Sequence, residues 1–156
     1  MSTPHVLVFY IGRHFLSLNL ESISEIFVLS QVTRVPVAPV FMRHVVSFRG
    51  MILPVVDLAP FLGEPIRATV THRTAVAVHL ETPEPAFALV IDSVVSVATG
   101  KLLNEKPADL PFFVEEPIGL PKGMVAWSVS PRRIEKFILS QLSATQRKFG
   151  VAYDKQ

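Results

Sequence analysis

The sequence predicts an all-β protein with a minor helical part, and three observations lead to this prediction. Short runs rich in Val, Ile and Phe recur at close spacing between Gly, Pro, Asn or Asp residues, which is typical of many short strands. The 13 prolines are spread along the chain, and proline lacks the N–H that long helices and central strands need. With 156 residues, 49% of them hydrophobic, the chain suits one domain or two small sub-barrels sharing a core.

Eight segments are predicted to be strands from their apolar composition and the turn residues that flank them. They are Val6 to Ile11, Phe15 to Leu20, Val45 to Phe48, Met51 to Val56, Thr74 to Leu80, Phe87 to Ile91, Val94 to Val97 and Met124 to Val129. The loop Glu64 to His72 and the Pro-rich segment Lys101 to Lys122 are predicted to be mobile connections.

Two segments depart from the strand pattern. The stretch SLNLESISEIFV is predicted to start as a strand and to continue as a short helix from Glu21, because Ile23, Ile26 and Phe27 share one helical face. The second segment, SPRRIEKFILSQLSATQRKFG, is a stronger helix prediction.

This C-terminal helix has start and stop signals as well as an apolar stripe. Ser130 is its N-cap, Pro131 takes the first position and Gly150 is the stop. The amphipathic pattern favours a helix packed on its own barrel, and a partner-binding helix is the alternative. The stripe comprises Ile134, Phe137, Ile138, Leu142 and Phe149.

Composition limits the classes of function. The chain has no cysteine, which excludes disulfides, thiolate metal sites and cysteine nucleophiles. Its 15 Lys and Arg residues are scattered among 13 Asp and Glu residues, giving a net charge of +2 that only weakly supports nucleic-acid binding. Charged residues interrupt every apolar run, so we expect no membrane insertion. The N-terminal sequence does not fit a secretory signal, so we expect a cytoplasmic protein.

No catalytic or metal-binding pattern is found in the sequence. The five histidines lack the spacing of metal ligands, and no G-x-S-x-G or phosphate-binding glycine motif occurs. Asp57 and Asp92 each end an apolar run, where a carboxylate usually accepts backbone N–H bonds and starts a turn. We therefore predict no catalytic, cofactor or metal site.

The stretch VVSFRGMILPVVDL, Val45 to Leu58, is predicted to be a hairpin with Arg49-Gly50 as its two-residue turn. Gly50 supplies the positive φ, Pro54 marks an edge or a bulge, and Asp57 closes the strand. Both faces are mostly apolar, which predicts a wall between two packed barrels. Arg49 is either a solvated turn residue or a partner contact. The predicted facing pairs are Phe48 with Met51, Val46 with Leu53, Ser47 with Ile52 and Val45 with Pro54.

Several of these segments, in this order, resemble the CheW family of chemotaxis coupling proteins over roughly residues 5 to 140. The resemblance implies two five-stranded SH3-like β-barrels that share a hydrophobic core, with a C-terminal helix. It also implies one domain over residues 5–140, with 141–156 as the helix end and tail. The similar segments are LVFYIG, Ile23 to Ile26, VTRVPVAPVF, VVSFRGMILPVVDLAPFLG and FALVIDSVVSV.

The resemblance further implies an adaptor without enzymatic activity. Such adaptors couple the cytoplasmic tips of methyl-accepting chemoreceptors to the regulatory domain of a CheA-type histidine kinase, in arrays at the membrane. Kinase contacts would use exposed loops and edges of the sub-barrels, and self-association is left open. Carried over by position, the receptor-facing groove between the barrels would include Ile23, Glu25, Val32, Arg49 and Gly50.

Two departures from the family pattern lie close to this proposed groove. His44 replaces a usual Gly and would be a titratable group in the groove, and Ser47-Phe48 replace a usual Asn-Leu. These departures favour, as an alternative, a coupling protein of a divergent system that controls pilus motility or another output. A β-barrel that binds nucleic acid is the less favoured alternative.

Overall fold

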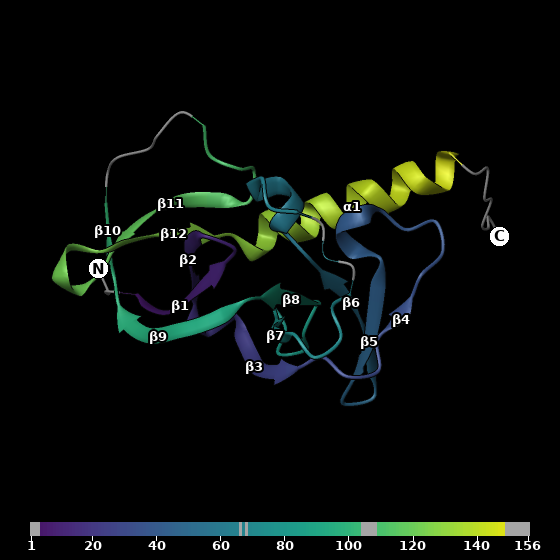
Figure 1. Cartoon of the computed structure of the whole chain (residues 1–156), viewed down its shortest axis with the longest axis horizontal. Helices are drawn as coiled ribbons and strands as arrows, with labels where there is room; N and C mark the ends of the chain where they lie inside the picture. Colours follow the sequence, from purple (N-terminus) through teal and green to yellow (C-terminus); the bar gives the residue numbers. More distant parts are fainter. Residues whose placement is uncertain (1–3, 66, 68, 104–108, 149–156) are drawn as a thin grey trace.

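The computed structural model describes residues 4–65, 67, 69–103 and 109–148 (Figure 1). These residues form twelve strands, four short 3-10 helices and one α-helix. The strands are β1 His5–Ile11, β2 His14–Asn19, β3 Ile23–Val28, β4 Thr33–Arg34, β5 His44–Phe48, β6 Met51–Val56, β7 Thr74–Val78, β8 Phe87–Ile91, β9 Ser93–Thr99, β10 Lys101–Leu102, β11 Val114–Gly119 and β12 Val125–Val129. The helices are η1 Leu20–Ser22, η2 Val40–Met42, η3 Ala59–Leu62, η4 Pro121–Gly123 and α1 Pro131–Lys148.

The strands form two six-stranded sheets. The first barrel has the order β10-β11-β12-β2-β1-β9, and the second has the order β3-β7-β8-β6-β5-β4. In each sheet the two outermost strands follow one another along the chain, as expected where a sheet curls round and one bent strand closes it. In the second barrel, the ring centroids of Phe27 on β3 and Phe48 on β5 lie 4.8 Å apart, although these strands are far apart in the sheet order.

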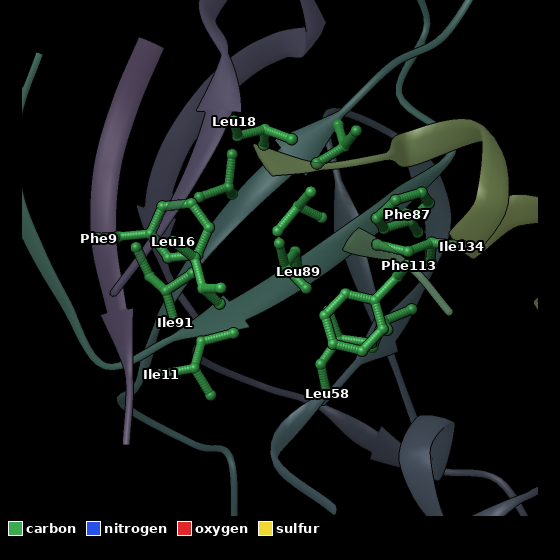
Figure 2. Packing of buried hydrophobic residues seen from close by; sticks show 14 of the residues in the cluster. Phe9, Ile11, Leu16, Leu18, Leu58, Phe87, Leu89, Ile91, Phe113 and Ile134 are labelled. Carbon is green, nitrogen blue, oxygen red and sulfur yellow. The ribbon is translucent and has the colours of Figure 1, made fainter. Parts of the chain in front are cut away.

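The buried side chains form three clusters, and the largest lies between the barrels. It joins residues of β1, β2, β12 and α1 to residues of β6, β7 and β8, and we call it the shared core (Figure 2). Each barrel also has an interior of its own. The predicted fold, two barrels packed over a common core with a C-terminal helix, is therefore confirmed, although each sheet has six strands where five were expected.

Strands β7 and β8 form the wall between the shared core and the interior of the second barrel. All five residues of β8 are buried: Phe87, Leu89 and Ile91 point into the shared core, while Ala88 and Val90 point into the second barrel. The prediction that the Val45–Leu58 hairpin forms this wall is wrong for most of its length, since only its end contributes: Val55 packs in the second barrel, and Val56 packs in the shared core. The hairpin strands β5 and β6 direct Ser47 and Ile52 to solvent, and 67% of Ile52 is exposed.

The local predictions for that hairpin are confirmed. Arg49 and Gly50 form its turn with φ of 51° and 79°, and all four predicted facing pairs occur in the register. Pro54 immediately precedes the residues at which β6 begins to pair with β8. Asp57 follows the last residue of β6, and its Oδ1 accepts a hydrogen bond from Ala59 N–H at 3.0 Å.

The predicted helix from Glu21 is wrong. Leu20–Ser22 form only a 3-10 turn, and β3 then pairs with β7. The apolar residues at Ile23, Ile26 and Phe27 fit either period, because β3 carries apolar side chains on both faces: Phe27 packs against the second barrel, whereas Ile26 is 40% exposed. Pairing with β7 satisfies the backbone of β3, and this tertiary contact overrides the local helical pattern.

The segment Lys101 to Lys122, predicted to be a mobile connection, contributes two strands. β10 pairs with β11, and β11 pairs with β12 across a register shift between Val114 and Pro117. The irregularity accommodates the proline inside the strand. Residues 104–108 lie outside the described part of the chain.

Helix α1 starts as predicted. Pro131 is its first residue, and Ser130 Oγ accepts a hydrogen bond from Arg133 N–H at 3.2 Å. Ile134 and Ile138 are buried in the shared core, whereas Leu142 is exposed. The helix therefore packs on its own protein, as the favoured interpretation expected. Phe149 and Gly150 lie outside the described residues.

The helix also connects the barrels. It follows β12 of the first barrel, and the ring of Phe137 contacts that of Phe41 on η2 at 5.0 Å between centroids. Figure 1 shows α1, in yellow, running past the second barrel. Within the described residues, no helix combines the length and the apolar character needed to cross a membrane.

Candidate partner-binding surface

The chain crosses from the second barrel to the first through a single residue, Asp92. β8 ends at Ile91 and β9 starts at Ser93, so the two strands belong to different sheets with only Asp92 between them. The backbone N–H of Asp92 donates to the carbonyl of Tyr10 on β1 at 2.9 Å. The position of β9 relative to the second barrel is therefore set at this residue.

Exposed apolar side chains lie on β9 and on β3, the outermost strands of their sheets. We call Ile26, Val28, Val94 and Val97 the β3–β9 surface, and their exposed fractions are 40%, 58%, 45% and 59%. Exposed apolar residues on these two edge strands make the β3–β9 surface a candidate for contact with a protein partner.

The register shows that the two halves of this surface lie on either flank of the shared core. Residues directly opposite one another in a ladder point to the same face. Val94 and Val97 lie opposite Phe9 and Leu7, which are shared-core residues. On the other side, Ile26 lies opposite Val76, another shared-core residue. The β3–β9 surface thus extends the junction between the barrels to solvent.

The other face of β3 carries an ion pair. Arg49, at the tip of the β5–β6 hairpin, donates from Nη2 to Glu25 Oε1, and its guanidinium lies 5.1 Å from the centre of the Phe48 ring. Glu25 lies opposite Ala77, which points into the second barrel. The pair is therefore adjacent to the β3–β9 surface along the chain but on the opposite side of β3.

The structure brings some of the six predicted site residues together and separates others. Glu25, Arg49 and Gly50 meet at the hairpin tip, and Val32 packs against the interior of the second barrel. Ile23 packs against the shared core instead. His44 starts β5, at the end of the hairpin opposite Arg49, about 17 Å away at the usual rise per strand residue.

His44 lies in a basic environment on β5. It is opposite Arg34 of β4 in the ladder and follows Arg43. Burial lowers the pKa of His44 below its ordinary value, and the positive charges of Arg43 and Arg34 lower this pKa further. The imidazole therefore favours its neutral form, and His44 belongs to a different part of the surface from Arg49.

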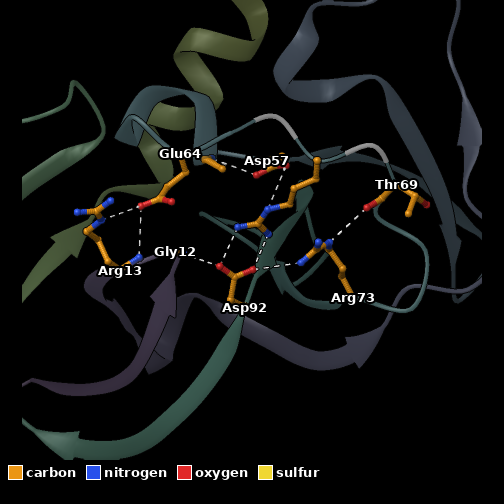
Figure 3. Close-up of polar contacts among 9 residues, drawn as sticks. Gly12, Arg13, Asp57, Glu64, Thr69, Arg73 and Asp92 are labelled. Atoms are coloured by element: carbon orange, nitrogen blue, oxygen red, sulfur yellow. Dashed lines mark hydrogen bonds and ion pairs between the residues drawn. The ribbon is translucent and has the colours of Figure 1, made fainter.

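A cluster of charges surrounds Asp92 at the junction (Figure 3). Its carboxylate accepts a hydrogen bond from Gly12 N–H in the β1–β2 turn. Arg67 approaches it with both terminal nitrogens: Nη1 lies 2.6 Å from Oδ1, and Nη2 donates to Oδ2 at 2.8 Å. Arg73 Nη1 lies 3.3 Å from Oδ1. The predicted role of a strand-end carboxylate, acceptance of a backbone N–H, is confirmed for Asp92 as it is for Asp57.

A second carboxylate supports the same turn. Glu64, two residues after η3 of the second barrel, lies 3.6 Å from Arg13 Nε and 3.4 Å from His14 Nε2. Gly12 has φ of 60°, and a Cβ at this position would lie 2.3 Å from the Glu64 carboxyl carbon. The positive φ therefore favours glycine here, and a larger residue would also have to displace the carboxylate of Glu64. Among the described residues, no group of three or more His, Asp or Glu side chains could hold a metal ion.

A comparison with known protein families identifies the family of this two-barrel chain. A family profile described as CheW-like domain matches residues 5–110. The chain belongs to the CheW-like domain family. The profile includes both halves of the β3–β9 surface and all six predicted site residues.

This CheW-like chain is also similar to two individual proteins. It is 32% identical over 95 residues to a probable chemotaxis protein CheW of Rhizobium etli, a match covering 60% of this chain and 59% of that protein. The chain thus matches less than two thirds of the relative's length. In fold it resembles the crystal structure of the scaffolding protein TtCheW from Thermoanaerobacter tengcongensis, with a TM-score of 0.68 and 19% identity over 83% of this chain and 90% of that one.

The sequence analysis did not predict the exposed apolar residues of the β3–β9 surface of this CheW-like chain. Ile26 was assigned to a helix, and Val94 and Val97 were assigned to a strand without a surface role. The available signal was the run SVVSVAT, in which valines fall on both faces of one strand. Valines on both faces of a strand indicate that both faces need to be covered, and in this structure Val94, Val95 and Val97 are all exposed.

Proposed function

We propose that the chain is an adaptor in a bacterial chemosensory system. It couples the cytoplasmic tips of methyl-accepting chemoreceptors to the regulatory domain of a CheA-type histidine kinase. Membership of the CheW-like family supports this role, as do the chemotaxis and scaffolding descriptions of its relatives. An adaptor needs binding surfaces and no catalytic group, and it works in the cytoplasm at membrane-associated receptor arrays.

The observation that carries the proposal is the exposed β3–β9 surface at the junction between the barrels. A receptor tip that presents apolar side chains would cover Ile26, Val28, Val94 and Val97 and remove them from water. The partly exposed Arg49–Glu25 pair, on the other side of the edge strand β3, offers a charged donor and a charged acceptor to a partner that extends over this edge. Apolar burial would supply affinity, and the ion pair would select the partner.

The charge arrangement disfavours the nucleic-acid alternative. Five arginines have carboxylate partners, which are Glu64 for Arg13, Glu25 for Arg49, Asp92 for Arg67 and Arg73, and Glu81 for Arg132. Charges neutralised in this way are poorly placed to contact phosphates. One relative is described as a probable chemotaxis protein, which favours a chemotaxis output. A divergent output system, suggested by the departures at His44 and Ser47-Phe48, is the alternative.

Co-sedimentation with receptor and kinase tests the proposal. The native chain is mixed with a soluble chemoreceptor hairpin that contains the cytoplasmic tip, with the kinase regulatory domain, or with both. We expect binding to each partner separately at tens of micromolar and a ternary complex when both are present. If neither partner binds, the adaptor assignment is wrong; if nucleic acid binds instead, the alternative replaces it.

A further inference from the structure

The two halves of the β3–β9 surface are joined at one end by the charges around Asp92. Asp92 directly precedes β9, which carries Val94 and Val97. Thr74, the first residue of β7, lies opposite both Ile91 of β8 and Val28 of β3. Ile91, which directly precedes Asp92, and Val28, the last residue of β3, are therefore both neighbours of Thr74.

Arg73 reaches both halves of the surface. Its carbonyl accepts a hydrogen bond at 2.8 Å from Leu29 N–H, immediately after β3. Its side chain reaches Asp92 Oδ1, immediately before β9. Arg73 thus links the residue that follows β3 to Asp92, and Asp92 in turn is held to the first barrel through Gly12 N–H and the carbonyl of Tyr10.

Arg67 fixes the carboxylate that Arg73 contacts. Its side chain is only 9% exposed, and its guanidinium lies between Asp92 and Asp57, with Nε 3.9 Å from Asp57 Oδ2. A planar guanidinium with two contacts to one carboxylate restricts the orientation of both groups. Gly12 N–H adds a hydrogen bond to the same carboxylate from the first barrel.

We propose that Arg67 and Arg73 are positioning residues that act through Asp92 to set the separation of β3 and β9, and thereby the shape of the surface that binds the receptor tip. The part of this inference that concerns binding rests on the proposed adaptor function. The part that concerns barrel geometry does not need a partner. A rigid, preformed surface binds more tightly because less order has to be imposed on binding.

A distance measurement tests the geometric part. The chain has no cysteine, so Ser47→Cys on β5 and Ser96→Cys on β9 give one spin label on each barrel. Both serines are exposed and lie outside the charge cluster. Electron spin resonance then gives the distance distribution between labels in the otherwise native chain and in the Asp92→Asn and Arg73→Gln variants.

We expect a broader or shifted distribution of label distances in Asp92→Asn and in Arg73→Gln. The control is Arg132→Gln, which removes the surface ion pair with Glu81 and should keep the native distribution. Arg73→Lys keeps the charge and should retain most of the native distribution. Thermal unfolding identifies variants that are folded, and Arg73→Gln decides the question if Asp92→Asn does not fold. A native distribution in a folded Arg73→Gln variant overturns the proposal.

Affinity for the soluble receptor hairpin tests the binding part. We expect Arg73→Gln to bind about fivefold or more weakly, a modest coupling between sites, and Arg132→Gln to bind like the native chain. A broadened distribution with unchanged affinity overturns the positioning role. If the native chain does not bind the hairpin at all, the adaptor function fails, and the distance measurement alone decides whether the cluster holds the barrels.

Discussion

The guanidinium of Arg67 forms an ion pair with the carboxylate of Asp92 at the point where the chain passes between the barrels. Nη1 lies 2.6 Å from Oδ1, and Nη2 donates to Oδ2 at 2.8 Å. Only 9% of the Arg67 side chain and 26% of the Asp92 side chain are exposed. Loss of either partner would leave the other charge largely excluded from water.

Arg67→Ala should lower the free energy of unfolding by about 2–3 kcal/mol. Breaking a fully buried pair costs about 3–5 kcal/mol, and partial hydration of Asp92 reduces this cost. Urea denaturation measures the change, with Arg132→Ala as a matched control. Arg132 forms an exposed ion pair with Glu81 at 3.0 Å, so removing its side chain should lower the free energy of unfolding by less than about 1 kcal/mol. Equal losses in the two variants would contradict the structural role of Arg67.

Gly50→Val should destabilise the protein by about 1 kcal/mol or more, because a β-branched residue resists positive φ. Gly50 has φ of 79°, and a Cβ there would meet no atom within 4 Å, so the cost comes from the backbone. Gly50→Asn is the control, since Asn tolerates the left-handed conformation better. Thermal unfolding compares the three proteins, and unchanged stability of Gly50→Val would refute the turn assignment.

His44→Gln should make the stability less dependent on pH. The folded state lowers the pKa of His44 below its ordinary value of 6.5, so the unfolded chain binds the proton more readily. The contribution of His44 to the free energy of unfolding is therefore fully present above pH 6.5, and this contribution is lost as the pH falls through the lower pKa of the folded state. Urea denaturation from about pH 7 to about pH 5 should show a smaller loss in His44→Gln. Identical losses would contradict the environment described for this imidazole.

Arg49→Ala and Glu25→Ala should each weaken binding to the receptor hairpin while leaving the fold intact. The two side chains form a partly exposed ion pair, so each substitution should cost less than about 1 kcal/mol of unfolding free energy. Titration calorimetry measures the affinities, and the double variant shows whether the residues act as a unit, in which case the losses are not additive. Native affinity in both single variants would remove the pair from the binding site.

Local rules predicted the parts of this fold that depend on neighbours in the sequence. The Arg49-Gly50 turn requires positive φ at both residues, and the alternation of β5 and β6 follows from that turn. The cap at Ser130 and the start at Pro131 are equally local. These features could be predicted because few residues decide them.

The misassigned parts depend on partners that are distant in the sequence. β3 became a strand because β7, about fifty residues later, supplies its hydrogen bonds. β7 and β8, rather than most of the hairpin, form the wall because the first barrel packs against the outer face of these two strands, and the sequence of the hairpin does not contain that information. Exposure of Ile26 and Val97 likewise follows from where the two sheets end, and periodicity does not contain that information.

The most direct test of the adaptor role is the affinity of the soluble receptor hairpin for four proteins: the native chain, Ile26→Asp, Val97→Asp and the control Val125→Asp. Val125 is an exposed valine of β12, outside the β3–β9 surface. We predict that both surface variants bind at least about tenfold more weakly, because a charge would replace a buried apolar contact, and that Val125→Asp binds like the native chain. Equal affinity in all four proteins would show that the receptor tip does not bind the β3–β9 surface.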